Sequence, residues 1–379
     1  MRLSKTIRGI RRMRKAAAAF TPSQSGGRLQ PLPAFGSNPG DLHAFFHMPD
    51  GVKGPVPLVV VLHGCTQDAA GYDRGSGWSQ LADRLGFAVL FPEQKRSNNP
   101  NLCFNWYQPQ DAGRGKGEAA SIRAMIAAMA KTHPIDGERI FVTGLSAGGA
   151  MASVMLAAYP EVFAGGAIIA GLPFGCASGL AEAFGCMGGG GGAEAAVLAE
   201  RVRSASGHKG PWPRVSVWHG SSDNIVSPDN GETIVRQWTA LHGLPASPTR
   251  TETVDGYPRR VWMGAGGEVA VEHYSVTGMG HGTPLNPGSG EGESGVAMPH
   301  MLDVGLSSTD RIADFFGIAG EPKRAERSAA KAKAPPAPAA AVPAAPRRRA
   351  AASAKSAKPG AAGLQKVIED ALKAAGLMR

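Results

Sequence analysis

The sequence predicts an α/β fold in which helices cover both faces of a central, mostly parallel sheet. Six short apolar runs, rich in β-branched residues, alternate along the chain with longer stretches of helical spacing. Runs that are apolar at successive positions are typical of strands buried on both faces, and alternation of strand and helix is typical of parallel strands joined by right-handed crossovers. We expect residues 29–318 to form one such domain.

The expected elements follow in chain order. PLVVVLHG (57–64) is an apolar, β-branched run that stops at His-Gly, and it predicts the first strand. The same reasoning predicts strands at 87–93, 139–144, 165–171, 214–220 and 271–280. Helical spacing of apolar residues predicts helices at 78–86, 117–133, 149–160, 231–243 and 308–317.

Charge divides the chain into three parts. The formal net charge is +10, but residues 1–28 carry eight Lys or Arg and no acid, and residues 319–379 carry 13 bases and four acids. Residues 29–318 are therefore net negative, at −7. The basic ends can contact an anionic or hydrophobic surface, while specific nucleic-acid binding is not expected.

Residues 1–28 are expected to form a solvated basic arm. Leu3, Ile7, Ile10 and Met13 are spaced like one face of a helix, so an amphipathic helix that lies on a surface is one alternative, and a targeting peptide is another. The apolar core of a secretory signal is not recognisable in this segment, which leaves a cytoplasmic location open. No run of 18 apolar residues occurs, so we expect no transmembrane helix.

The other end of the chain predicts a linker followed by a short helix. Residues 319–363 consist mainly of Ala, Pro, Lys and Arg, and have too few apolar side chains to offset the entropy of ordering, so we expect a disordered linker. Residues 364–379 show an apolar stripe at helical spacing. Because so short a helix is marginal alone, we expect it to fold on a partner or surface, with packing on its own domain as the alternative.

The pentapeptide Gly-Leu-Ser-Ala-Gly places Ser146 between an expected strand and an expected helix. The pattern alone is weak evidence, because 52 of the 379 residues are glycine. Its setting is that of a nucleophilic serine raised above the edge of a sheet on a sharp turn. Gly144, Gly148 and Gly149 leave room for the turn, and the positive end of the following helix favours a developing anion. The alternative is a serine that only caps the helix.

A nucleophilic serine of this kind needs an acid and then a histidine, in that chain order. Asp223 follows the strand that ends at residue 220 and is the preferred acid, whereas Asp229 lies where a helix cap is expected. His281 lies between glycines just after the last strand and is the preferred base, with His300 as the alternative. The sequence thus predicts Ser146, Asp223 and His281 as a catalytic triad.

The negative oxygen formed during attack on a carbonyl needs hydrogen-bond donors. One predicted donor is the backbone N–H of Ala147. The others are the N–H groups of Cys65 and Thr66, in the loop after the first expected strand. His63 in the same loop is a candidate for substrate contact, and a packing role is an equally good interpretation.

Seven stretches together resemble the polyhydroxybutyrate (PHB) depolymerase family of esterases, relatives of feruloyl and acetylxylan esterases in the α/β-hydrolase superfamily. They are LHGCTQDA (62–69), CFNWY (103–107), VTGLSAGGAM (142–151), AGLPFGCA (170–177), AEAFGCM (181–187), WHGSSDNIV (218–226) and GMGHGTP (278–284). The resemblance implies an α/β-hydrolase fold and serine esterase activity, with no metal or organic cofactor. It also implies the roles given above for Ser146, Asp223 and His281.

The resemblance further implies that Cys65 pairs with Cys103 and that Cys176 pairs with Cys186. Spacing alone says only that Cys176 and Cys186 can close a short loop. Two disulfides imply an extracellular location, against the absence of a recognisable signal. The resemblance also places Asn105 and Trp106 beside the substrate, although plain packing is an equal alternative for Trp106.

We therefore expect residues 29–318 to be the catalytic domain of a serine esterase that works through an acyl-enzyme. The expected substrates are poly- or oligo-(3-hydroxyalkanoate) or similar short-chain esters. A feruloyl or acetylxylan esterase acting on acylated sugars is the alternative. A binding protein that uses its basic termini is an alternative of another class.

Overall fold

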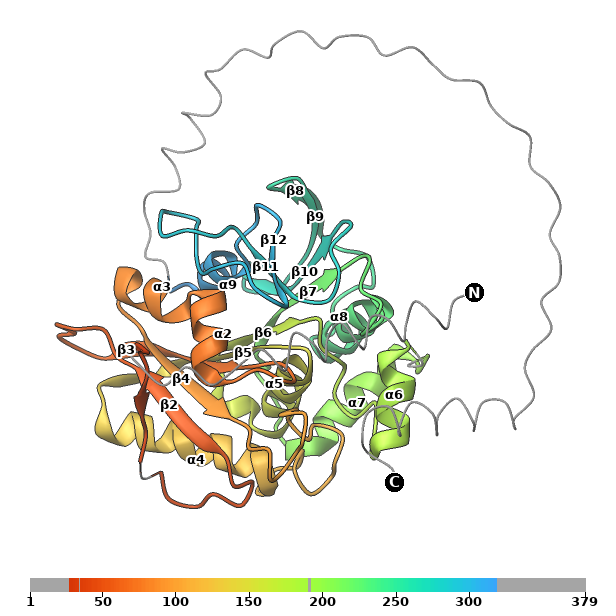
Figure 1. The fold of residues 1–379 in the computed structure, drawn as a ribbon. Helices are drawn as coiled ribbons and strands as arrows, with labels where there is room; N and C mark the ends of the chain where they lie inside the picture. The colour runs from red at the N-terminus through yellow and green to blue at the C-terminus, as the bar shows by residue number, and fades with distance from the viewer. Residues whose placement is uncertain (1–26, 34, 190–191, 319–379) are drawn as a thin grey trace, which may run out of the picture. The chain divides into compact units, whose positions relative to one another are not determined.

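The computed structural model describes residues 27–33, 35–189 and 192–318, and its central feature is a ten-stranded sheet (Figure 1). The strand order is β1-β2-β4-β3-β5-β6-β7-β10-β9-β8. The strands of this sheet are β1 (Gln30–Pro31), β2 (His43–His47), β3 (Val56–Leu62), β4 (Ala88–Glu93), β5 (Ile135–Leu145), β6 (Gly165–Ile169), β7 (Arg214–Gly220), β8 (Arg250–Val254), β9 (Tyr257–Met263) and β10 (Val269–Val276). A separate two-stranded sheet pairs β11 (Thr283–Leu285) with β12 (Met301–Asp303).

The centre of the large sheet is parallel and its edges are antiparallel. The pairings that join β4, β3, β5, β6, β7 and β10 are all parallel. Strands β2 and β1 extend one edge, and β9 and β8 the other, through antiparallel pairings. Because the six central strands run in one direction, their C-terminal ends meet at the same edge of the sheet, which we call the C-terminal edge.

Helices cover both faces of the sheet (Figure 1). They are α2 (Ala69–Ser76), α3 (Trp78–Leu85), α4 (Gly117–Thr132), α5 (Ala147–Ala158), α6 (Leu180–Met187), α7 (Ala195–Ser206), α8 (Asp229–Leu241) and α9 (Ser308–Phe316), with a 3₁₀ turn at Pro160–Val162. One apolar core joins the sheet to α4, α5, α7 and α8, and a second joins the other face to α2, α3 and α9. Side chains alternate along β3, so Leu58 and Val60 lie in the first core, and Val59 and Val61 lie in the second.

Each predicted strand and each predicted helix overlaps an observed one. The sequence patterns do not predict the edge strands, β11 and β12, or α2, α6 and α7. Strand β8 illustrates why: its residues, RTETV, are polar and largely exposed at the edge of the sheet, so they form no apolar run. The turn between β8 and β9 contains Asp255 and Gly256, both with positive φ, at 50° and 88°.

The predicted termini lie almost wholly outside the described residues. Only residues 27 and 28 of the predicted basic arm (1–28) are described, and none of the predicted linker (319–363) or C-terminal helix (364–379) is. Those boundaries therefore stay predictions. All the described residues belong to one compact unit. Within them, no helix combines the length and the apolar character that crossing a bilayer requires.

Candidate active site

Ser146 lies on a strained turn between β5 and α5. Its φ of 58° is positive, although it is not glycine. The turn is tight: a Cβ atom on Gly144 would lie 2.4 Å from the carbonyl oxygen of Gly148, and one on Gly148 would lie 2.3 Å from that of Leu62. The Ser146 hydroxyl makes no capping hydrogen bond to α5. The geometry is that of a nucleophile turn and does not support the capping alternative.

Asp223 and His281 meet where the loops after β7 and β10 lie side by side. The N–H of Ser222 donates to the carbonyl oxygen of Met279 at 3.0 Å, and the N–H of Gly278 donates to Oγ of Ser221 at 2.9 Å. These bonds hold Nδ1 of His281 at 2.7 Å from Oδ2 of Asp223. The predicted acid and base are therefore a hydrogen-bonded pair.

The Asp223 carboxylate is buried but well supplied with donors. Its Oδ1 accepts hydrogen bonds from the N–H groups of Ile225 at 2.9 Å and Val226 at 3.0 Å, and Nε2 of His219 lies 3.5 Å from its Oδ2. Burial alone would raise the pKa of Asp223, but contacts with His219 and His281 and the backbone N–H groups hold it well below its ordinary value. Asp223 is thus ionised at neutral pH and can stabilise an imidazolium.

The alternative acid and base lie elsewhere. Asp229 is the first residue of α8, and its Oδ2 accepts a hydrogen bond from Oγ of Ser227 at 3.2 Å. Nδ1 of His300 lies 3.2 Å from the carbonyl oxygen of His281 and is not joined to a carboxylate among the described residues. The His300 ring packs edge-on against the His281 ring, with 5.8 Å between their centres. His300 therefore supports the loop of His281.

Topology brings Ser146 to the same edge as the Asp223–His281 pair. The three residues follow β5, β7 and β10, all of which end at the C-terminal edge, and β6 lies between β5 and β7. The N–H of Ser146 donates to the carbonyl oxygen of Ile169, the last residue of β6, at 2.9 Å. In the described part of the chain, the Ser146 hydroxyl and His281 do not form a hydrogen bond.

Two of the three predicted oxyanion donors are free to act. In the part of the chain that the structure describes, the N–H groups of Ala147 and Cys65 have no hydrogen-bond acceptor. The N–H of Thr66, in contrast, donates to the carbonyl oxygen of Asn101 at 2.6 Å. This bond ties the loop after β3 to the segment that precedes Cys103 and disfavours Thr66 as an oxyanion donor, a role that stays a prediction.

His63 is a packing residue. It is 1% exposed, the N–H of Gln94 donates to its Nε2 at 3.1 Å, and its Nδ1 lies 2.8 Å from the carbonyl oxygen of Gly64. Burial lowers the pKa of His63 to about 4, so the ring is neutral. Both ring nitrogens are engaged, which supports the packing alternative, while substrate contact by His63 stays a prediction.

The Cys65–Cys103 disulfide joins the loop after β3 to the CFNWY stretch (103–107), as the resemblance implied. Asn105 is held by internal hydrogen bonds. Its N–H and its Nδ2 donate to Glu118 at 2.8 Å each, and its Oδ1 accepts from Asn99 at 3.1 Å. These bonds favour a structural role, and substrate contact by Asn105 stays a prediction.

Glu118, at the start of α4, is a residue of this site that the sequence analysis missed. It is 1% exposed and also accepts a hydrogen bond from Nε2 of Gln94 at 2.5 Å. Burial raises the pKa of Glu118 to about 8, although these donors act in the opposite direction. At the start of a helix a glutamate usually faces solvent, so its sequence position gave no sign of a buried role. Glu118 holds the stretch that carries Cys103.

Trp106 stays a predicted substrate contact. The side chain is 9% exposed and packs edge-on against Tyr107, with 5.4 Å between the ring centres. It belongs to the apolar core that also contains α5. These contacts agree with the packing alternative and leave little surface for a ligand.

The second predicted disulfide is not formed. Cys176 and Cys186 are free thiols, and Sγ of Cys186 instead lies 2.7 Å from the carbonyl oxygen of Cys176, to which it donates. The sulfur of Cys186 is therefore directed at the backbone of its expected partner. Cys186 lies on α6, which is joined to the loop after Asp223 because the N–H of Ser227 donates to the carbonyl oxygen of Met187 at 2.7 Å.

An apolar surface lies on this part of the molecule. Leu180 and Phe184 of α6 are 39% and 50% exposed, and Val197 of α7 is 50% exposed. Leu180 and Phe184 are four residues apart and share one helix face. We call these three residues the α6–α7 apolar residues. The C-terminal end of α6 contacts the loop after Asp223 through the carbonyl oxygen of Met187.

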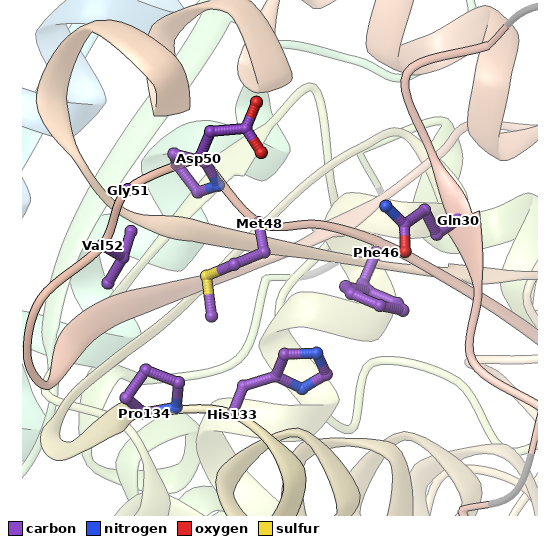
Figure 2. Close-up of a pocket in the computed structure, with 9 residues that line it drawn as sticks. Gln30, Phe46, Met48, Asp50, Gly51, Val52, His133 and Pro134 are labelled. Atoms are coloured by element: carbon purple, nitrogen blue, oxygen red, sulfur yellow. The ribbon is translucent and has the colours of Figure 1, made fainter.

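A hollow of about 360 Å³ lies away from these residues (Figure 2). It is lined by residues that precede β3 and β5, such as Val52 and Pro134, and by Phe46 and Met48 near the end of β2. The ring of His133 packs on Phe46, with 4.7 Å between the ring centres. Since it lies where parallel strands begin, this hollow is at the opposite edge of the sheet from Ser146. Among the described residues, no group of three or more His, Cys, Asp or Glu could hold a metal ion.

Comparison with known proteins points to one class of enzyme. The family described as "Esterase PHB depolymerase" matches residues 42–253. Poly(3-hydroxyalkanoate) depolymerase C of Paucimonas lemoignei is 48% identical over 299 residues, which are 79% of this chain and 72% of the relative. Acetylxylan esterase of Coprinopsis cinerea is 33% identical over 78% of this chain and 75% of the relative.

The fold comparison agrees. The structure of an acetyl xylan esterase from Aspergillus awamori aligns with a TM-score of 0.66 at 26% identity, and the alignment covers 77% of this chain and 100% of that one. The predicted parallel sheet with helices on both faces is confirmed as an α/β-hydrolase fold.

Proposed function

This chain belongs to the PHB depolymerase family of esterases and is a serine ester hydrolase, and from that premise we propose that Ser146, Asp223 and His281 are its catalytic triad. The observation that carries the proposal is the 2.7 Å contact between Nδ1 of His281 and Oδ2 of Asp223. It leaves Nε2 of His281 as the nitrogen that can accept the serine proton. The strained turn at Ser146 supports the role of nucleophile.

The reaction proceeds in two halves. Oγ of Ser146 attacks the ester carbonyl while its proton moves to Nε2 of His281, and the Asp223 carboxylate stabilises the imidazolium. The N–H groups of Ala147 and Cys65 donate to the tetrahedral oxyanion. The imidazolium then returns the proton to the leaving alkoxide, which departs as the alcohol. A water molecule, deprotonated by His281, cleaves the acyl-serine to the acid and frees Ser146.

We propose polyesters or oligomers of 3-hydroxyalkanoates as the substrates. The 48% identical relative is named as a poly(3-hydroxyalkanoate) depolymerase. Leu180 and Phe184 share one exposed face of α6, whose C-terminal end contacts the loop after Asp223, and such a face suits contact with an insoluble, apolar chain. An acetylated polysaccharide is the second candidate, because the aligned structure with a TM-score of 0.66 is an acetyl xylan esterase.

The location and the termini are further parts of the proposal. The Cys65–Cys103 disulfide favours an oxidising, extracellular environment. Residues 29–318 are proposed as the catalytic domain, and the basic segments 1–28 and 319–379 as contacts to an anionic or hydrophobic surface.

Removing residues 319–379 should weaken co-sedimentation with polyester granules but leave hydrolysis of a soluble ester unchanged. Equal co-sedimentation of both proteins would contradict the role of this segment.

The test of the triad is Ser146→Ala. The variant should hydrolyse p-nitrophenyl butyrate about 10⁴-fold more slowly than the parent, or worse, and should no longer react with a fluorophosphonate probe. Ser204→Ala, which alters an exposed serine of α7, is the control and should match the parent. Parental turnover by Ser146→Ala would show that another residue is the nucleophile.

A further inference from the structure

Two histidine nitrogens near Asp223 are buried without a hydrogen-bond partner. They are Nδ1 of His219, on β7, and Nε2 of His273, on the neighbouring strand β10. The two residues are 2% and 3% exposed. An unpaired polar atom in a protein interior is unfavourable and uncommon, so two such atoms in one place point to a group that they share.

Both nitrogens face Gly231 on α8, the helix that packs over β7 and β10 (Figure 1). A Cβ atom built on Gly231 would lie 3.2 Å from each of them. The two nitrogens therefore flank one point beside the helix. Any larger residue at 231 would press on both rings.

The neighbours of each ring determine where its hydrogen lies. Nη2 of Arg260, on β9, lies 2.5 Å from Nδ1 of His273. A guanidinium can only donate, so Nδ1 accepts and the hydrogen of the neutral ring is on Nε2. The ring is neutral because burial lowers the pKa of His273 to about 4. The unpaired nitrogen of His273 is therefore a donor.

His219 has the complementary arrangement. Its Nε2 lies 3.0 Å from the carbonyl oxygen of Val226 and 3.5 Å from Oδ2 of Asp223, and both of these atoms are acceptors. Nε2 must therefore carry a hydrogen, and in the tautomer with this single hydrogen Nδ1 is an acceptor. A donor and an acceptor thus lie beside the open side-chain position of Gly231, and two polar partners are the fewest that hold a buried water molecule.

We propose that one internal water molecule joins the two rings, accepting from Nε2–H of His273 and donating to Nδ1 of His219. The water fixes His219 in the tautomer that donates to Val226 and turns its N–H toward the Asp223 carboxylate. His219 is then a positioning residue for the acid of the proposed triad, and His273 sets the tautomer of His219. This inference rests on the proposed function only in taking Asp223 as that acid.

The result is a chain of hydrogen bonds from the surface to the site. Nη2 of Arg260 also donates to Oε1 of Glu232, on α8, at 2.6 Å. Glu232 and Arg260 are the charged groups that face His273, and Asp223, with His281 beyond it, faces His219. Loss of the water would let His219 take its other tautomer, with a bare nitrogen turned toward a carboxylate.

The tautomers can be read directly by long-range ¹H–¹⁵N correlation spectra of the full chain at pH 7. We expect His219 and His273 both to be neutral with the hydrogen on Nε2, with signals assigned from the single variants His219→Gln and His273→Gln. The hydrogen on Nδ1 of His219, or a doubly protonated His219 ring, would overturn the proposal. This readout does not depend on activity, so it stays decisive even if Ser146→Ala retains full turnover and the triad is rejected.

Gly231→Ala tests the water and its effect on catalysis together. Alanine favours a helix over glycine, so a loss of activity would not come from a weakened α8. We expect kcat for p-nitrophenyl butyrate to fall about tenfold with KM nearly unchanged, as for loss of one hydrogen bond to a charged group, and the His219 signals to change. Gly185→Ala, in α6, is the matched control, because a Cβ there meets no atom within 4 Å.

Three results of the Gly231→Ala experiment would overturn the inference. Parental kcat with parental His219 signals would reject the bridging water. A lower kcat with parental signals would mean a steric effect alone, which also rejects it. Changed signals with parental kcat would remove the positioning role of His219.

Discussion

Oδ2 of Asp223 lies 2.7 Å from Nδ1 of His281, although 58 residues separate the two in the sequence. Parallel pairing of β7 with β10 brings the loops that follow these strands together. The backbone hydrogen bond from Ser222 to Met279 then fixes how the loops lie. The position of the acid is therefore set by the sheet and not by local sequence.

Asp223→Asn should lower kcat for p-nitrophenyl butyrate about 10³- to 10⁴-fold. An amide in this position can present N–H to Nδ1 of His281, which favours the tautomer with its hydrogen on Nε2 and so removes the base. Asp229→Asn is the matched control, since Asp229 accepts a hydrogen bond from Ser227 and does not contact His281. Similar losses in both variants would contradict the assignment of the acid.

Gly148→Ala should disrupt the nucleophile turn. The added Cβ would lie 2.3 Å from the carbonyl oxygen of Leu62 and 2.5 Å from that of His63, and backbone atoms cannot move aside cheaply. We expect the free energy of unfolding to fall by about 2 kcal/mol or more, with most esterase activity lost. Urea denaturation and steady-state kinetics measure the two effects. Gly185→Ala in α6 has open space for its Cβ and should change neither.

The centre of the fold, and the contact between Asp223 and His281, could be predicted from the sequence because local patterns and chain order indicate them. An apolar run such as 57–64 identifies a buried strand, and chain order places Asp223 and His281 after later strands. The edge strand β8 could not be found this way, since one polar face and one antiparallel neighbour leave no apolar run.

The hydrogen-bond partners of individual N–H groups and side chains could not be predicted from the sequence. The sequence places Thr66, His63 and Asn105 in the right loops, but only the folded loops decide that the Thr66 N–H meets Asn101 and that Asn105 meets Glu118. The same limit applies to Cys186, whose sulfur meets a carbonyl oxygen where a disulfide was predicted. Residue type and spacing indicate which loop a residue occupies. Which partner its polar groups bond to depends on tertiary contacts.

Glu118 should make the protein less stable as pH rises from about 5 to 8. Burial raises the pKa of this carboxyl from its ordinary value of 4.5 to about 8. Between these values the folded chain holds a proton that the unfolded chain has lost, so rising pH favours unfolding, by at most about 1.4 kcal/mol per pH unit. Above pH 8 this effect stops growing, because both states are ionised.

Glu118→Gln removes the titrating group and should flatten that pH dependence. Urea denaturation at half-unit steps from pH 5 to 8.5 measures the slope for both proteins. Glu138→Gln, which changes an exposed glutamate of β5, should keep the parental slope. If Glu118→Gln also keeps the parental slope, the raised pKa of Glu118 is wrong.

The double variant Leu180→Ser/Phe184→Ser should hydrolyse polymer more slowly than the parent but hydrolyse a soluble ester at nearly the parental rate. Both side chains are exposed, at 39% and 50%, so their loss should barely affect folding. Contact with an insoluble polyester would lose apolar area, and we expect release of acid from a poly(3-hydroxybutyrate) film to fall about tenfold. Turnover of p-nitrophenyl butyrate should stay within about twofold, because a small ester needs no extended apolar surface.

Val296→Ser is the matched control for that experiment. Val296 is 51% exposed and belongs to the loop between β11 and β12, where its N–H donates to the carbonyl oxygen of Gly75 at 3.0 Å. It should leave film hydrolysis unchanged. Parental film hydrolysis by Leu180→Ser/Phe184→Ser would argue that α6 does not meet the polymer. If the parent protein deacetylates xylan faster than it hydrolyses the film, the polysaccharide esterase is favoured. Because both outcomes are read on the same preparation, the substrate class is decided independently of the triad.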